Sequence, residues 1–135
     1  MPSLNPSQHQ LKRFAEQMPV GEPILMLNLL RFNDQAAYPA ESDQQPCSGR
    51  EAYAVYSRTA IKKVRAAGGD VELMANARVA LIAPEHEHWD EVLLVRYPSP
   101  DAFLAMLADP EYRAATIHRT AALADSRLIG CNPRS

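Results

Sequence analysis

The order in which hydrophobic periodicities change along this chain constrains its fold more than any other feature. Segments with the two-residue period of a strand alternate with segments that have the 3.6-residue period of a helix. The predicted order is strand, helix, strand, strand, helix, strand. The segments are a strand at 23–32, a helix at about 49–67, strands at 70–83 and 91–97, a helical stretch at 99–123 and a strand at 125–131.

This βαββαβ order predicts a ferredoxin-like α+β fold with a four-stranded antiparallel sheet. An extra helix precedes it at 6–18, with Asn5 as its cap and Pro6 at the first helical position. Pro110 follows an aspartate inside the last helical stretch, which predicts two helices with a break there. We expect a single domain over 1–135, made of an N-terminal helix extension at 1–19 and the α+β domain at 20–131.

Two strands carry apolar side chains on both faces. In 23–32 one face carries Ile24, Met26, Leu30 and Phe32 and the other carries Leu25, Leu27 and Leu29, and 91–97 behaves in the same way. Such strands are covered on both sides, yet the helices of one βαββαβ unit cover only one face of the sheet. The simplest cover for the other face is a second copy of the sheet, so the pattern predicts a homodimer.

Composition excludes several classes of function. The chain has 47% hydrophobic and 22% charged residues, with a net charge of −2. This balance gives no basic face for nucleic acid, and the aliphatic strand at 91–97 lacks the exposed aromatics of an RNA-recognition sheet. No apolar run is long enough for a membrane span, and no signal peptide is predicted. Cys47 and Cys131 have no metal or redox spacing; reduced thiols in the cytoplasm are favoured, with a disulfide left open.

A set of short motifs resembles a known family. The motifs are Met26–Phe32, Cys47–Tyr53 with Tyr56, Gly68-Gly69, Trp89–Ser99, Ala102–Met106, Asp109–Tyr112 and Arg119–Leu128. Over residues 20–130 the chain resembles domain of unknown function 1330, in the dimeric α+β barrel superfamily. The resemblance implies a face-to-face dimer of α+β barrel domains. Relatives in the superfamily include cofactor-free monooxygenases, polyketide cyclases, isomerases, haem-degrading enzymes and proteins with no known catalysis.

Asn28 and Arg119 are the sharpest candidates for a site. Asn28 is polar in the middle of a buried strand, so it is either satisfied by neighbouring backbone or a hydrogen-bond donor in a pocket. Arg119 falls on the helix stripe expected to face the sheet. It either pairs with a carboxylate such as Asp125 or Asp90, or binds an anionic ligand through its planar fork.

For each further candidate site residue, a structural role is an alternative to the functional one. His118 is a candidate acid or base, or a half-buried structural histidine. Tyr53 and Tyr56 belong to a core stripe, and either could line a pocket. His86 and His88 read as a solvated turn, so no metal site is predicted. The aperiodic segment at 33–47 is interpreted as a lid that covers or borders the pocket.

These residues support two alternative functions. The first is a cofactor-independent enzyme, monooxygenase-, isomerase- or cyclase-like, acting on a small, partly apolar or anionic molecule with Arg119, His118 and Asn28 as catalytic candidates. The second is a non-catalytic dimeric protein that binds a small ligand in the same pocket of Asn28, Tyr53, Tyr56 and Arg119. No organic cofactor or metal is predicted in either case, because the chain has no phosphate loop, dinucleotide fingerprint or Cys-x-x-Cys motif.

Overall fold

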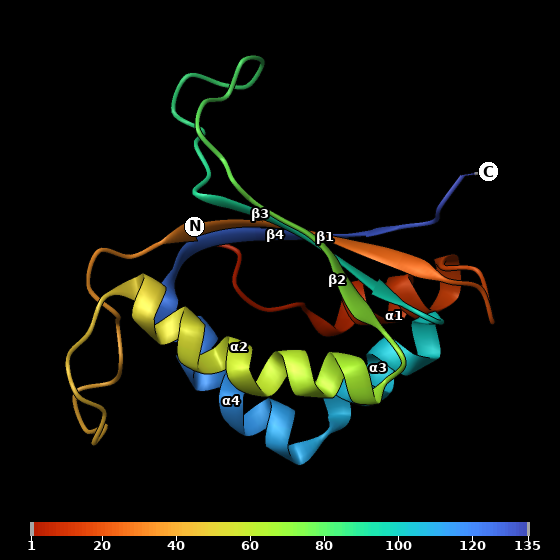
Figure 1. Ribbon diagram of the computed structural model, residues 1–135, viewed down its shortest axis with the longest axis horizontal. Helices are drawn as coiled ribbons and strands as arrows, with labels where there is room; N and C mark the ends of the chain where they lie inside the picture. The colour runs from red at the N-terminus through yellow and green to blue at the C-terminus, as the bar shows by residue number, and fades with distance from the viewer. Residues whose placement is uncertain (1, 135) are drawn as a thin grey trace.

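The computed structural model describes residues 2–134 and has the predicted ferredoxin-like architecture (Figure 1). One antiparallel sheet has the strand order β2-β3-β1-β4, with the last strand beside the first. The elements are α1 (Gln8–Gln17), β1 (Ile24–Phe32), α2 (Gly49–Ala66), β2 (Asp70–Asn76), β3 (Glu91–Tyr97), α3 (Pro100–Ala108), α4 (Pro110–Ala122) and β4 (Leu123–Cys131).

Local capping chemistry sets where the helices begin. Ser7 and Ser48 each form a capping box with the residue three positions on, so α1 begins after Ser7 rather than at Pro6 as predicted. The predicted break at Pro110 is confirmed. Asp109 ends α3 and its carboxylate accepts hydrogen bonds from the first backbone N–H groups of α4, which separates the two helices.

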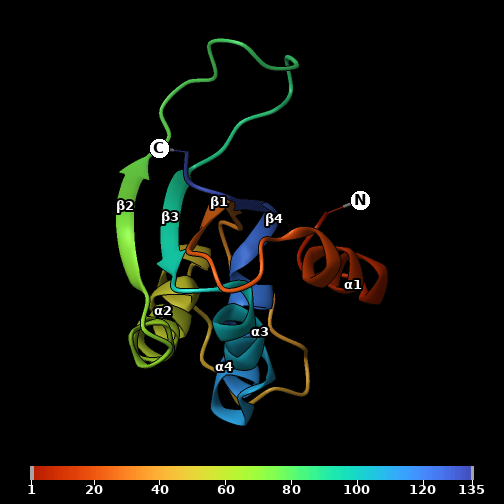
Figure 2. The same cartoon turned by 90° about the vertical axis from the view of Figure 1, so that its right-hand side faces the viewer.

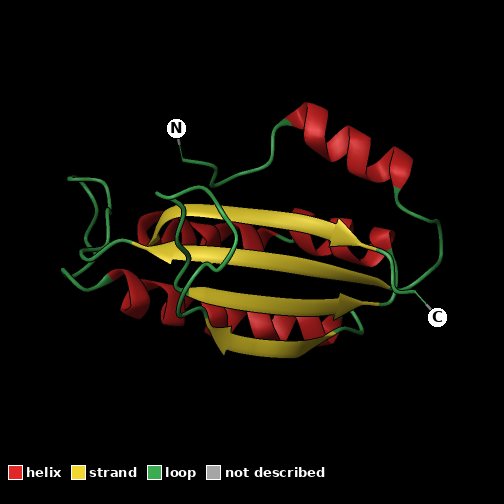
Figure 3. Ribbon diagram, turned by 90° about the horizontal axis from the view of Figure 1, so that it is seen from above, coloured by secondary structure: helices red, strands yellow, loops and turns green. Residues whose placement is uncertain are grey.

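The helices lie on one face of the sheet. α2, α3 and α4 cover that face, and α1 lies beside the β4 edge (Figures 2 and 3). The side chains of β1 alternate accordingly: Ile24, Met26 and Leu30 are buried under the helices, whereas Leu25 and Leu27 point to the other face and stay half-buried. Both faces of β1 are therefore apolar, as predicted, and no helix or strand of the described residues covers the second face.

The predicted length of β2 was wrong. The strand ends at Asn76 rather than at 83, because its partner β3 begins at Glu91, which pairs with Asn76. A register shift between Val71 and Leu73 also interrupts the regular alternation of a strand. Val71 pairs with Val95 on the helix face, whereas Leu73 pairs with Leu94 on the open face.

Two glycines hold positions that other residues do not fit. Gly68 has a φ of +88° after the end of α2, as expected of a helix C-cap. Gly49, the first residue of α2, lies where the end of β1 meets the α4–β4 junction. A Cβ there would stand 2.2 Å from the Asn33 carbonyl oxygen and 2.6 Å from that of Ala122.

Candidate functional site

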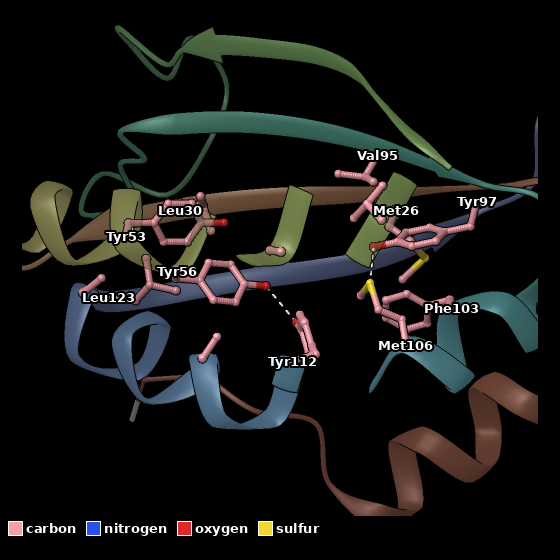
Figure 4. Packing of buried hydrophobic residues seen from close by; sticks show 14 of the residues in the cluster. Met26, Leu30, Tyr53, Tyr56, Val95, Tyr97, Phe103, Met106, Tyr112 and Leu123 are labelled. Carbon is pink, nitrogen blue, oxygen red and sulfur yellow. Dashed lines mark hydrogen bonds between the residues drawn. The ribbon is translucent and has the colours of Figure 1, made fainter. Parts of the chain in front are cut away.

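A large cavity lies between the helix face of the sheet and α2 and α4. Its volume is about 1220 Å³, and it is lined mostly by apolar and aromatic side chains. Residues 3–6, ahead of α1, also line it. Tyr53, Tyr56 and Tyr112 lie between the sheet and the helices, with Tyr97 and Phe103 further along (Figure 4). This is the setting in which a few polar groups would orient a small ligand.

The tyrosines supply hydroxyl groups that keep their protons. Burial raises the pKa of Tyr53 far above its ordinary value, and the Arg119 guanidinium opposes this shift only in part. Burial also raises the pKa of Tyr56, whose hydroxyl shares a hydrogen bond of 2.7 Å with that of Tyr112. These side chains therefore act in the cavity as neutral hydrogen-bond groups rather than as phenolates.

Asn28 is buried on β1 and lines the cavity, with 8% of its surface exposed. Its Nδ2 donates to the carbonyl oxygens of Met26 and Leu93, at 3.3 Å each. Both neighbours accept hydrogen bonds, so the amide nitrogen must face them and Oδ1 is the group left over. The two hypotheses for Asn28 therefore apply to different ends of its amide. The nitrogen has a structural role, because it bonds to the backbone, and the oxygen is an acceptor available to a ligand.

Arg119 lines the cavity from α4, and its predicted carboxylate partners are engaged elsewhere. Asp125 lies 3.0 Å from the Arg127 guanidinium, and Asp90 accepts from the Phe32 N–H at 2.8 Å. Within residues 2–134, no carboxylate lies within ion-pair distance of Arg119. Its Nη1 donates to the backbone carbonyl of Leu4. The structural ion pair considered for Arg119 is therefore wrong, and the groups beside its guanidinium, the Leu4 carbonyl and the Tyr53 hydroxyl, are neutral.

The segment before α1 forms a strap over the cavity beside Arg119. The Ser126 hydroxyl donates to the Ser3 carbonyl, and the Ser3 N–H donates to Asp125 at 2.9 Å. Burial tends to raise the pKa of Asp125, but hydrogen bonds from Ser3, Ser126 and Arg127 outweigh it and hold the pKa below its ordinary value. The strap is thus anchored to an ionised carboxylate.

Glu91 is a cavity residue that the sequence interpretation missed. It lies at the start of β3, lines the cavity and is close enough to Tyr53 to raise that residue's pKa. Burial raises the pKa of the Glu91 carboxyl itself, and the Arg50 guanidinium partly opposes this. The sequence could have placed it there, because the two-residue period of a strand puts Glu91 on the same face as Leu93 and Val95, which face the helices. The cavity therefore contains a carboxyl group suited to proton transfer.

His118 and the 33–47 segment lie away from the cavity. His118 does not line it; instead its Nδ1 shares a 2.6 Å hydrogen bond with the Tyr38 hydroxyl. Ala37 N–H also bonds to the Ala121 carbonyl, so the segment packs against the end of α4. No residue of 33–47 lines the cavity, although the flanking Phe32 and Arg50 do. The prediction of a covering lid is therefore wrong, and His118 holds a loop.

Neither a metal cluster nor a membrane helix is found in the described part of the chain. Across residues 2–134, no three His, Cys, Asp or Glu side chains gather as a metal ion would require. Among the same residues, no helix has the length and apolarity needed to cross a membrane.

Fold and cavity together define a class: a ferredoxin-like α+β protein whose helices enclose an aromatic, partly polar cavity against one sheet face. Two solved structures are similar over nearly the whole chain. The RPA0582 protein of unknown function from Rhodopseudomonas palustris is 39% identical, over 100% of this chain and 99% of that one, with a TM-score of 0.89. The methylated RPA0582 protein is 40% identical, over 99% and 96%, with a TM-score of 0.90. This chain therefore belongs to the same family as RPA0582.

A more distant structure shares the fold alone. SnoaB, a cofactor-independent oxygenase from Streptomyces nogalater, is 17% identical over 84% of this chain and 95% of that one, with a TM-score of 0.53. No protein-family model and no curated protein matches the sequence.

Proposed function

We propose that the protein binds a small, partly aromatic anion in the cavity and acts on it without an organic cofactor or metal. The observation that carries this proposal is Arg119, a guanidinium that lines the cavity and has no carboxylate within ion-pair distance among the described residues. Arg119 is half-buried, and a partly desolvated cation without a counter-ion is costly unless something compensates it. A ligand carboxylate, phenolate or enolate would do so through paired hydrogen bonds.

The remaining polar groups support proton transfer on the bound molecule. Glu91, with its raised pKa, would accept a proton from an acidic C–H or O–H of the ligand. Arg119 would stabilise the anion that forms, and the Tyr53 hydroxyl and Asn28 Oδ1 would fix its orientation. Such a step begins isomerase- and cyclase-like reactions, and it also begins cofactor-independent oxygenation, where the anion reacts with dioxygen. The reaction named for SnoaB is of that last kind, but the cavity residues rather than this distant similarity support the proposal.

A turnover screen tests this proposal. The protein would be incubated with small phenolic, carbonyl and lactone compounds, with and without oxygen, and Glu91→Gln would be the matched control because it keeps the volume and removes the base. Turnover that falls at least about a hundredfold in Glu91→Gln would support catalysis, since general base catalysis typically contributes this much. Binding without turnover in either protein would favour the second candidate, a non-catalytic small-ligand-binding protein, which the same cavity supports.

We also propose a homodimer joined through the open sheet faces. Leu25, Leu27 and Leu29 of β1 lie on this face half-buried, and Leu73 and Ile129 are each 48% exposed there. An apolar sheet face of this kind is stabilised by a second copy that packs about 10 Å away. Light scattering at micromolar concentration should give twice the chain mass, and a stable monomer would contradict the dimer.

The finer family assignment is a separate proposal. We infer membership of the domain of unknown function 1330 family from the motifs at Met26–Phe32, Trp89–Ser99 and Asp109–Tyr112. A profile built from RPA0582 and its homologues, aligned to that family, would test it.

A further inference from the structure

Residues 77–90, between β2 and β3, form an arm that rises away from the helices, on the side of the open sheet face (Figures 1 and 2). Every residue from 78 to 88 is exposed. Three of them are large and apolar: Val79, Leu81 and Ile82 are 85%, 92% and 94% exposed. Three such side chains close together on one protruding loop are costly in water and mark an interaction surface.

The base of the arm is firmly attached to the sheet. The Ala77 N–H donates to the Asp90 carbonyl at 3.0 Å, and the Asp90 N–H donates to the Leu30 carbonyl at 2.7 Å. Trp89 lies against the Arg127 guanidinium, 5.2 Å from the ring centroid. The arm is therefore tied to the sheet at its base, whereas residues 78–88 beyond the base are exposed.

The indole of Trp89, at the base of the arm, carries a polar group that the described part of this chain leaves unpaired. Its Nε1 is the one buried side-chain nitrogen or oxygen within residues 2–134 that has no hydrogen-bond partner. Buried polar groups are normally paired.

We propose that the arm clasps a second copy of this chain, packing Val79, Leu81 and Ile82 against it beside the stacked sheets. The inference rests on the proposed homodimer. Its basis is position: the arm stands on the same side as the open apolar face, so a sheet packed about 10 Å above that face lies alongside it. In a two-fold dimer each copy gives and receives one arm, and both apolar surfaces are buried by one association.

Charge is also complementary between the arm and the open face. The outer arm carries Glu85 and Glu87, whereas the open face carries Arg31, which continues the alternation of β1; Arg96 on β3 is already paired with Glu72 at 2.9 Å. Opposite charges at the rim of an apolar contact fix its register and suppress wrong partners. This pattern favours a second copy over a membrane surface, for which an acidic tip is unsuited.

The test compares the wild type with a triple variant, Val79→Ser/Leu81→Ser/Ile82→Ser, by sedimentation over a dilution series. Because all three side chains are exposed, the variant should keep its circular dichroism spectrum. Its dimer dissociation constant should rise at least tenfold. Val20→Ser, at a site that is also 85% exposed but lies outside the arm, should leave the constant unchanged. Trp89 is the only tryptophan, so its fluorescence should shift on dilution in the wild type at the concentration where the dimer dissociates.

The outcomes separate this inference from the dimer itself. A wild type that stays monomeric refutes the dimer and the arm together. A wild-type dimer whose dissociation constant changes less than twofold in the triple variant refutes the arm alone. Flotation with phosphatidylcholine vesicles tests the competing occupant. Arm-dependent flotation with an unchanged dimer constant would assign the arm to a membrane instead.

Discussion

Replacing Arg119 by methionine tests the central feature of the site. The guanidinium lines the cavity from α4, and the hydrogen bond that the structure gives it is to the backbone carbonyl of Leu4. Methionine occupies similar helical volume without charge. Removing the guanidinium leaves no carboxylate without a partner, because Asp125 is held by Arg127 and by backbone N–H groups.

The structure sets the expected size of two effects. On folding, the variant loses one hydrogen bond to a half-buried carbonyl, worth about 1 kcal/mol, or a melting temperature lower by about 3–5 °C. On binding, it loses charge-assisted hydrogen bonds to an anion, worth about 3 kcal/mol, which corresponds to roughly a hundredfold in affinity. Calorimetric titration with 2-naphthoate and its neutral analogue 2-naphthamide separates the contribution of charge from that of the aromatic ring.

The wild type should prefer the naphthoate, and Arg119→Met should lose that preference while its affinity for the naphthamide changes less than about threefold. The control is Lys62→Met, which removes the same charge from an exposed position of α2 outside the cavity. A variant that melts more than about 10 °C lower yet binds naphthoate as the wild type does would show that Arg119 mainly anchors the strap. A wild type with no preference for the anion would refute the anionic ligand.

Three further predictions concern stability. Glu91→Gln should raise the free energy of unfolding near pH 7, by less than about 1 kcal/mol, because burial raises the pKa of the Glu91 carboxyl and the folded state disfavours its charge. The contribution of Glu91 to wild-type stability should therefore fall as pH rises above 4.5, and below that pH urea titrations should show no difference in unfolding free energy between Glu91→Gln and the wild type. Tyr112→Phe should cost about 1 kcal/mol by leaving the Tyr56 hydroxyl buried without its partner, and a double-mutant cycle with Tyr56→Phe should recover part of that cost. Gly49→Ala should cost about 3 kcal/mol or more in urea unfolding, because its Cβ meets two backbone oxygens, whereas Ala54→Ser on the exposed side of α2 should change little.

The order of elements could be predicted from the sequence because local chemistry decides it. The capping serine before α2, the aspartate and proline between α3 and α4, and the glycine after α2 act over three or four residues. The alternation in β1 depends only on the period of a strand, so both apolar faces could be predicted. These signals lie within single segments, and all of them agree with the fold.

Residues whose role depends on distant neighbours could be predicted only as alternatives. Arg119 could be placed on the inner face of its helix, but its partner is a backbone carbonyl more than a hundred residues away, which no periodicity reports. His118 is the residue before Arg119 on the same helix. Its side chain bonds to Tyr38 of the 33–47 segment and does not line the cavity.

Pairing between strands decided the length of β2 and the position of Glu91. β2 looks longer in the sequence than it is, because a strand ends where its partner begins and Glu91 fixes that point. The same register places Glu91 in the cavity. A residue that the sequence predicts only as the start of a strand is therefore the candidate base of the cavity. The sequence by itself determined which segments are helices and strands and which faces are apolar, since those properties are local. Only the tertiary structure decided which polar groups share the cavity, because that depends on how segments far apart in the chain are brought into register.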